Sequence, residues 1–131
     1  MQDARHRVLA SIVRRRGQAE FRKALLAAYG GACSITGCTV TAILEAAHVH
    51  PYRGEQTNTV SNGLLLRADV HTLFDLGLLA VDSATMKVRV SPKLAGTDYA
   101  ALEGRQLAEP AVLSQRPSVG ALDWHRSRCT W

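Results

Sequence analysis

Residues 62–76 of this chain read Asn-Gly-Leu-Leu-Leu-Arg-Ala-Asp-Val-His-Thr-Leu-Phe-Asp-Leu, and residues 44–51 read Leu-Glu-Ala-Ala-His-Val-His-Pro. Apolar runs of this length predict two short strands, over residues 43–49 and 63–67, with a polar loop between them. Asp69 is placed to cap the N-terminus of a helix over residues 70–76, which Gly77 ends. The order is therefore strand, loop, strand and helix.

The regions on either side of these runs predict helices and one hairpin. Helical spacing of apolar residues predicts a helix from Asp3 to Val13, ended by Gly17, and a second from Glu20 to Tyr29. Beyond residue 77, Leu78–Val81 and Lys87–Val90 predict a hairpin. A short helical segment near residues 99–102 and a last helix over about 118–128 follow. We therefore expect one domain over residues 1–131, with helices over about 3–29, a core over about 33–77 and an extension over 78–131.

Composition sets mild bounds on function. A chain of 131 residues suits one domain, and a hydrophobic content of 47% argues against wholesale disorder. The formal net charge of +5 fits a polyanionic partner, although many basic proteins bind no nucleic acid. No apolar run approaches the ~20 residues that span a bilayer, and residues 1–7 lack the features of a signal peptide. We expect a cytoplasmic protein without membrane contact.

The three cysteines, Cys33, Cys38 and Cys129, favour reduced thiols. A closed zinc site normally takes four ligands, often as two close pairs, and here only Cys33 and Cys38 are close in sequence. Structural zinc is therefore not expected. The interpretation favoured for this pair is buried thiols beside a turn at Thr36-Gly37.

The order and spacing of His48, Asn62 and His71 resemble the HNH motif of a nuclease family. The resemblance runs from Arg22 to Leu79 and extends into the tail, and it rests on the following runs: Cys33–Gly37, Leu44–His48, Asn62–Asp69, His71–Asp75, Tyr99, Leu102–Gly104 and Leu122–Arg126. The subfamily it resembles contains the nuclease domains of modification-dependent restriction enzymes and of some anti-phage effectors. It implies an α+β fold: a ββα-metal core with an N-terminal helical segment and a C-terminal hairpin and helices.

The resemblance also implies the site residues. His48 would be the general base, Asn62 the residue that braces the loop, and His71 a ligand of a divalent metal ion. These roles suit the chemistry, because phosphodiester hydrolysis needs a proton acceptor for water, a cation on the phosphate and a frame that holds both. An imidazole also titrates near neutral pH, as a general base should.

The metal site departs from a common family pattern. Many HNH enzymes carry a second metal ligand just before the base, where this chain has Ala47. Asp75 lies four residues after His71, so on a helix the two side chains share a face. We therefore predict a metal site of His71 and Asp75 that binds Mg²⁺, Mn²⁺ or Ni²⁺. Glu45 is a weaker candidate, since strand alternation places it opposite Ala46 and His48.

Three side chains near the motif are predicted to contact nucleic acid. Arg53 follows the proposed base in the loop and could clamp a phosphate, and Arg67 and His50 are further candidates. The run Arg14-Arg15-Arg16 is interpreted as a solvated helix face.

The sequence leaves two functions open. The first is a metal-dependent DNA endonuclease of restriction or anti-phage defence, with targeting supplied by another domain or protein. The second is a non-catalytic DNA-binding or regulatory HNH-like module, for which the missing ligand at Ala47 is the main support. Cutting both strands would require two active sites, so a homodimer is considered as well.

Overall fold

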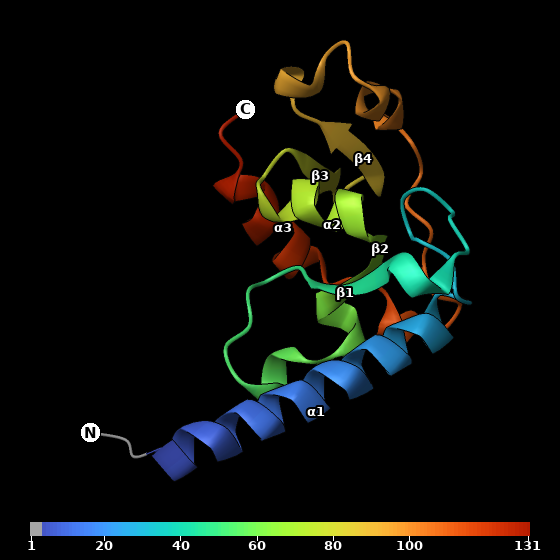
Figure 1. Cartoon of the computed structure of the whole chain (residues 1–131). Helices are drawn as coiled ribbons and strands as arrows, with labels where there is room; N and C mark the ends of the chain where they lie inside the picture. Colours follow the sequence, from blue (N-terminus) through green and yellow to red (C-terminus); the bar gives the residue numbers. More distant parts are fainter. Residues whose placement is uncertain (1–3) are drawn as a thin grey trace.

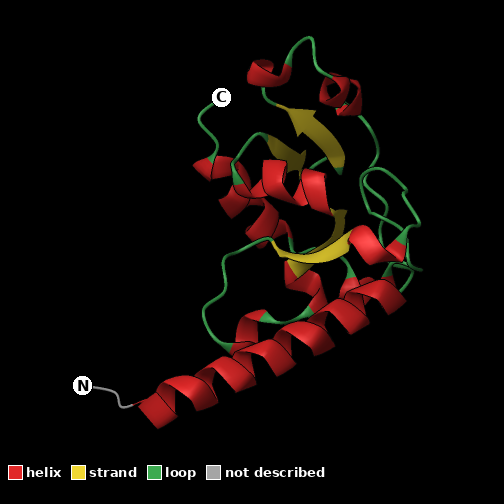
Figure 2. Cartoon of the chain, viewed as in Figure 1, coloured by secondary structure: helices red, strands yellow, loops and turns green. Residues whose placement is uncertain are grey.

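A computed structural model describes residues 4–131 and contains three α-helices and two hairpins among short 3-10 turns (Figures 1 and 2). The helices and strands, in chain order, are α1 (Ala4–Ala28), β1 (Leu44–His48), β2 (Gly63–Arg67), α2 (Ala68–Asp75), β3 (Leu79–Asp82), β4 (Lys87–Val90) and α3 (Val119–Arg128). The α+β fold with a ββα core, an N-terminal helical segment and a C-terminal extension is confirmed.

The ββα unit is continuous in sequence. β1 and β2 pair antiparallel in a register that sets Leu44 opposite Arg67 and His48 opposite Gly63, and α2 starts directly after β2. β3 and β4 form the second predicted hairpin, with Leu79 opposite Val90. His48 therefore lies at the last position of β1, where the long loop to β2 begins.

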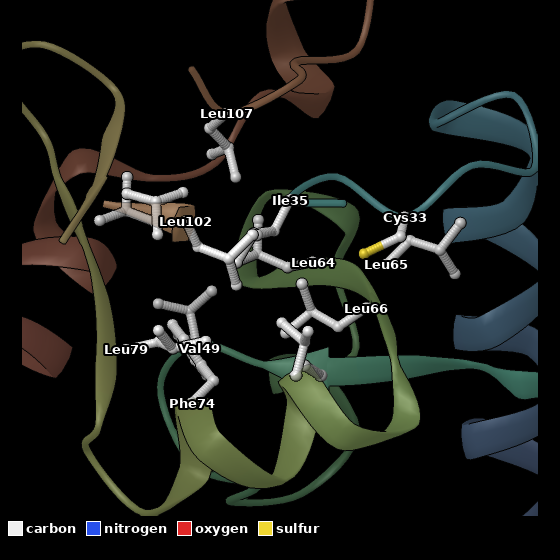
Figure 3. Packing of buried hydrophobic residues seen from close by; sticks show 14 of the residues in the cluster. Cys33, Ile35, Val49, Leu64, Leu65, Leu66, Phe74, Leu79, Leu102 and Leu107 are labelled. Carbon is white, nitrogen blue, oxygen red and sulfur yellow. The ribbon is translucent and has the colours of Figure 1, made fainter. Parts of the chain in front are cut away.

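The core lies between the ββα unit and the segments that cover it (Figure 3). Leu64, Leu65 and Leu66 are all fully buried, because both α1 and α2 pack against the β1–β2 hairpin. Phe74 of α2 is also fully buried, and the imidazole of His125 from α3 stacks on its ring with 3.7 Å between centroids. The residues that precede and follow His71 are thus anchored in the core.

A single helix, α1, replaces the two predicted over residues 3–29, and the expectation that Gly17 ends a helix was wrong. Asp3, where the first was expected to start, lies outside the described residues. Glycine in a helix costs only about 1 kcal/mol relative to alanine, which packing can offset. At Gly17 the absence of a side chain is used, since a Cβ there would lie 2.9 Å from Nδ2 of Asn58. Glycine thus lets the loop after β1 approach the helix closely.

Asp69 does not cap α2, which is a second correction. The helix begins at Ala68, so Asp69 lies in its first turn, where its Oδ1 accepts a hydrogen bond from the Val70 amide. The same carboxylate forms an ion pair with Arg67 and accepts a 2.7 Å hydrogen bond from the Tyr99 hydroxyl. The Arg67 guanidinium lowers the pKa of Asp69 well below its usual range. This cluster fastens the tail to the start of α2.

The cysteine turn is fastened to the end of β2. Sγ of Cys33, a buried free thiol, lies 3.3 Å from the backbone amides of both Thr36 and Arg67. Cys38 and Cys129 are also free. Within residues 4–131 no helix is long and apolar enough to cross a membrane.

Candidate active site

A pocket of about 570 Å³ brings the two motif histidines together. His48 lines it from the end of β1, and His71 and Asp75 line it from α2. The remaining walls come from α1, the loop after β1, the turn after α2, and α3, and their lining residues include Gln18, Tyr52, Gly77, Trp124 and Arg128. The pocket therefore joins segments from both ends of the chain.

The imidazole of His48 is held by neutral groups. Its Nε2 lies 2.7 Å from Oδ1 of Asn58, in the loop between β1 and β2. Its ring stacks on Phe21 of α1 at 4.5 Å between centroids and meets Tyr52 edge-on at 5.7 Å. Phe21 is itself fixed by close packing, because a Cβ at Gly63 would lie 2.6 Å from its ring. These contacts fix the orientation of the His48 ring, and His48 still lines the pocket.

Asn62 braces the loop through its amide. Its Oδ1 accepts a hydrogen bond from the His50 amide at 2.9 Å, and its Nδ2 donates to the carbonyls of His50 at 3.0 Å and Thr57 at 3.1 Å. The backbone carbonyl of Asn62 also accepts from the Val49 amide at 2.9 Å. These bonds continue the β1–β2 pairing beyond His48 and tie both ends of the loop to one residue.

His71 lies between two carboxylates, in contrast to His48. Its Nδ1 is 2.8 Å from Oε1 of Glu45, and its Nε2 is 3.1 Å from Oδ2 of Asp75. The Asp75 carboxylate, one helical turn away, is the main cause that raises the pKa of His71, and Glu45 acts in the same direction. This arrangement creates a local environment that favours a cation.

Glu45 contacts His71 although strand alternation made it only a weaker candidate for the metal site. Glu45 does lie on the other side of the strand from His48, but α2 packs against β1 and brings His71 to it. Alternation describes one strand and says nothing about the helix that crosses it.

The donor set fits a cation that retains much of its water. In the described part of the chain, no three His, Cys, Asp or Glu side chains converge as a metal site. His71 and Asp75 supply one nitrogen and one carboxylate, and Mg²⁺ often uses one or two carboxylates with water and phosphate oxygens. The Glu45 carboxylate on Nδ1 matches the outer partner that orients a metal-binding histidine.

The side chain of Ala47 does not line the pocket. It is fully buried in the core, whereas its neighbour Ala46 lines the pocket beside His48. An Asp at position 47 would place a carboxylate in the core, so that position is not suited to a metal ligand in this chain. A carboxylate added to serve the metal would belong at position 46.

The predicted nucleic-acid residues lie in different environments. Arg53 is exposed in the loop after His48. The guanidinium of Arg67 is occupied by Asp69, with nitrogen–oxygen distances of 2.6 and 2.9 Å. The ring of His50 packs against Trp124 at 4.3 Å between centroids, outside the lining of the pocket. Only Arg53 among the three is free of such side-chain contacts in residues 4–131.

Sequence reasoning missed Asn58, Trp124 and Arg128. Asn58 is one polar residue in a polar loop, and nothing local marks it as the partner of His48. Trp124 and Arg128 share one face of α3 by helical spacing, but the fold alone brings that face to the motif.

Comparison with known proteins agrees with this geometry. Residues 33–82 match the family described as HNH endonuclease. A solved structure described as "Modification dependent TagI restriction endonuclease" matches with a TM-score of 0.66 and 21% sequence identity, over 86% of this chain and 38% of that one. No curated protein matches the chain.

The matched family region contains the hairpin, the loop and the helix that carry the motif residues. The solved structure, at this level of identity, shows a shared fold over most of the chain, although the chain spans well under half of that protein. The resemblance predicted from the motif is therefore confirmed over residues 33–82, which match the HNH endonuclease family.

Proposed function

We propose that this domain hydrolyses phosphodiester bonds of DNA with the help of a divalent metal ion. The observation that carries the proposal is that one pocket is lined both by an imidazole among neutral groups, His48, and by an imidazole among carboxylates, His71. These are the environments needed for a proton acceptor and for a cation site.

His48 acts as the general base. With the Asn58 amide oriented as it lies, Nε2–H of His48 donates to Oδ1, so Nδ1 carries the free lone pair. The imidazole takes a proton from water while the water oxygen forms a bond to phosphorus and the bond from phosphorus to the leaving oxygen breaks. Phe21 and Tyr52 keep the ring from rotating away.

His71 and Asp75 would hold the metal ion, and Glu45 would orient His71. A bound Mg²⁺, Mn²⁺ or Ni²⁺ would supply positive charge to the phosphate in the transition state. His71 must present a neutral Nε2 to bind a metal, so binding releases a proton wherever that nitrogen is protonated beforehand. Asn62 keeps the loop in place, and Arg53 is the exposed cation of that loop that could contact a phosphate.

Restriction or anti-phage defence is the biological setting we propose, with DNA recognition supplied by a further domain or protein. The support is the likeness to a much longer protein that is described as a modification-dependent restriction endonuclease. Cleavage of both strands would also require a second copy of the site, and hence a dimer.

The direct test is nicking and linearisation of supercoiled plasmid by the purified chain with Mg²⁺, Mn²⁺ or Ni²⁺, against a chelated control. The His48→Ala variant should lower the rate by at least ~10²-fold, as expected for a lost general base. His6→Ala is the matched control, because it removes an imidazole from α1 roughly 18 Å along the helix from Gln18.

The result has a clear reading in either direction. Cleavage by folded His48→Ala at the wild-type rate would contradict the assignment of the base. DNA binding without cleavage in any of the metals would favour the non-catalytic alternative instead.

A further inference from the structure

Two arginines lie over aromatic rings that line the pocket. The guanidinium of Arg14, on α1, lies 5.8 Å from the ring centre of Tyr52, and that of Arg128, on α3, lies 5.8 Å from the ring centre of Trp124. Tyr52, Trp124 and Arg128 all line the pocket. Figure 1 shows α1 and α3 on different sides of β1, the strand that ends at the base.

The first pair adjoins His48 directly. Tyr52 meets the His48 ring edge-on, and Gln18, one helical turn after Arg14, lines the pocket. Arg14 therefore lies along the wall that α1 forms, a short distance from the proposed proton acceptor.

The second pair is held in place by the same brace as the base. The Trp124 ring packs against the His50 ring, and the His50 backbone is bonded through both its amide and its carbonyl to the Asn62 side chain. Arg128 thus lies on an indole whose position is fixed relative to His48. This relationship is absent from the sequence pattern and arises only from the fold.

Neither arginine is neutralised by an acid in the described residues. Ion pairs there engage Arg67 with Asp69 and Arg89 with Glu103, but not Arg14 or Arg128, and both of these side chains are exposed. A guanidinium above a ring still has its N–H groups available around its edge. Such donors match the oxygens of a phosphate.

We propose that Arg14 and Arg128 bind backbone phosphates of the DNA on the two sides of the scissile one, so that the cleaved strand crosses the pocket from α1 to α3. This inference rests on the proposed function, since it takes DNA as the substrate. It replaces the view of Arg14 as part of a solvated helix face. Arg128 lies in the last turn of α3, where the helix dipole favours a positive charge, but the dipole does not explain why its guanidinium lies over Trp124.

The test measures binding of a fluorescent DNA duplex by anisotropy, in chelator, over a series of salt concentrations. Each of Arg14→Gln and Arg128→Gln should reduce the slope of log K against log salt by ~0.9, the value for one lost phosphate contact, and should weaken binding on the order of tenfold at low salt. The double variant should lose about twice the slope.

Lys93→Gln is the matched control, because it removes one exposed positive charge from the 3-10 turn after β4, away from the pocket. Slopes of Arg14→Gln and Arg128→Gln that equal that of Lys93→Gln would overturn the inference, and so would a wild-type chain that does not bind duplex. Circular dichroism checks that every variant is folded.

The two proposals fail in different ways. Arginine-dependent binding by a chain that never cuts DNA would contradict the proposed function and would support only the two phosphate contacts. Cleavage that depends on His48, together with wild-type binding by both arginine variants, would do the reverse.

Discussion

The two histidines of the site have opposite surroundings. His48 is surrounded by an amide and two aromatic rings, whereas His71 is held between two carboxylates. In the proposed mechanism the imidazole among neutral groups accepts a proton, and the imidazole between carboxylates belongs to the cation site. The comparison teaches that the contacts around each ring, rather than the residue type, divide the chemistry.

The largest expected effect concerns the carboxylates. Asp75→Asn should raise the metal concentration for half-maximal cleavage by more than ~100-fold, because it removes one of two protein ligands, while Glu45→Gln should raise it by roughly 10- to 100-fold as an outer partner. The measurement is the cleavage rate over a titration of Mn²⁺. An equal metal requirement in wild type and Asp75→Asn would show that Asp75 is not a ligand.

The role of His48 can be tested by a substitution that leaves the imidazole itself unchanged. Gly17→Ala places a methyl group against the Asn58 amide that holds His48, so we expect the cleavage rate to fall about tenfold, a part of the ~10²- to 10⁴-fold that general-base catalysis contributes. The melting temperature should not fall, because alanine favours a helix by about 1 kcal/mol over glycine.

Gly120→Ala in α3 is the matched control, since the nearest atom to its added Cβ is 3.8 Å away, an ordinary contact. If Gly17→Ala lowered both the cleavage rate and the melting temperature, the contact between Gly17 and Asn58 would serve packing of the loop on α1, and the claim that it positions His48 would be contradicted.

Much of this division could be predicted from the sequence. The hairpin and α2 follow from local patterns of apolar residues, and the pairing of His71 with Asp75 follows from helical spacing alone. The end of a helix at Gly17 could not be predicted correctly, because glycine propensity is weaker than the packing that continues α1.

Contacts between distant segments were outside the reach of sequence patterns. Asn58 meets His48 across a loop, and Glu45 meets His71 across a strand and a helix. The cap predicted at Asp69 failed for a similar reason, since its carboxylate is bound by Arg67 and by Tyr99 from the tail.

A smaller effect is expected from pH, and it separates His71 from the core histidine His125. Burial lowers the pKa of His125 below its ordinary 6.5, so its contribution to stability is present above that value and is lost as pH falls through the lowered pKa. His71 has the opposite sign: its raised pKa gives stability that is present below 6.5 and is lost as pH rises through the raised value.

The check is the melting temperature of the wild type between pH 5 and 8 in chelator, compared with His125→Leu. In His125→Leu the melting temperature should decrease less than in the wild type as pH falls. As pH rises, it should decrease as it does in the wild type. An unchanged acid side would show that protonation of His125 does not limit stability.

The most direct test of the division between the two histidines is calorimetric titration of Mn²⁺ into wild type, His48→Ala and Asp75→Asn, with no DNA present. We predict that His48→Ala binds the metal as the wild type does, although it cleaves at least ~10²-fold more slowly, and that Asp75→Asn binds it much more weakly. Loss of metal binding in a folded His48→Ala chain, with binding retained in Asp75→Asn, would contradict the account.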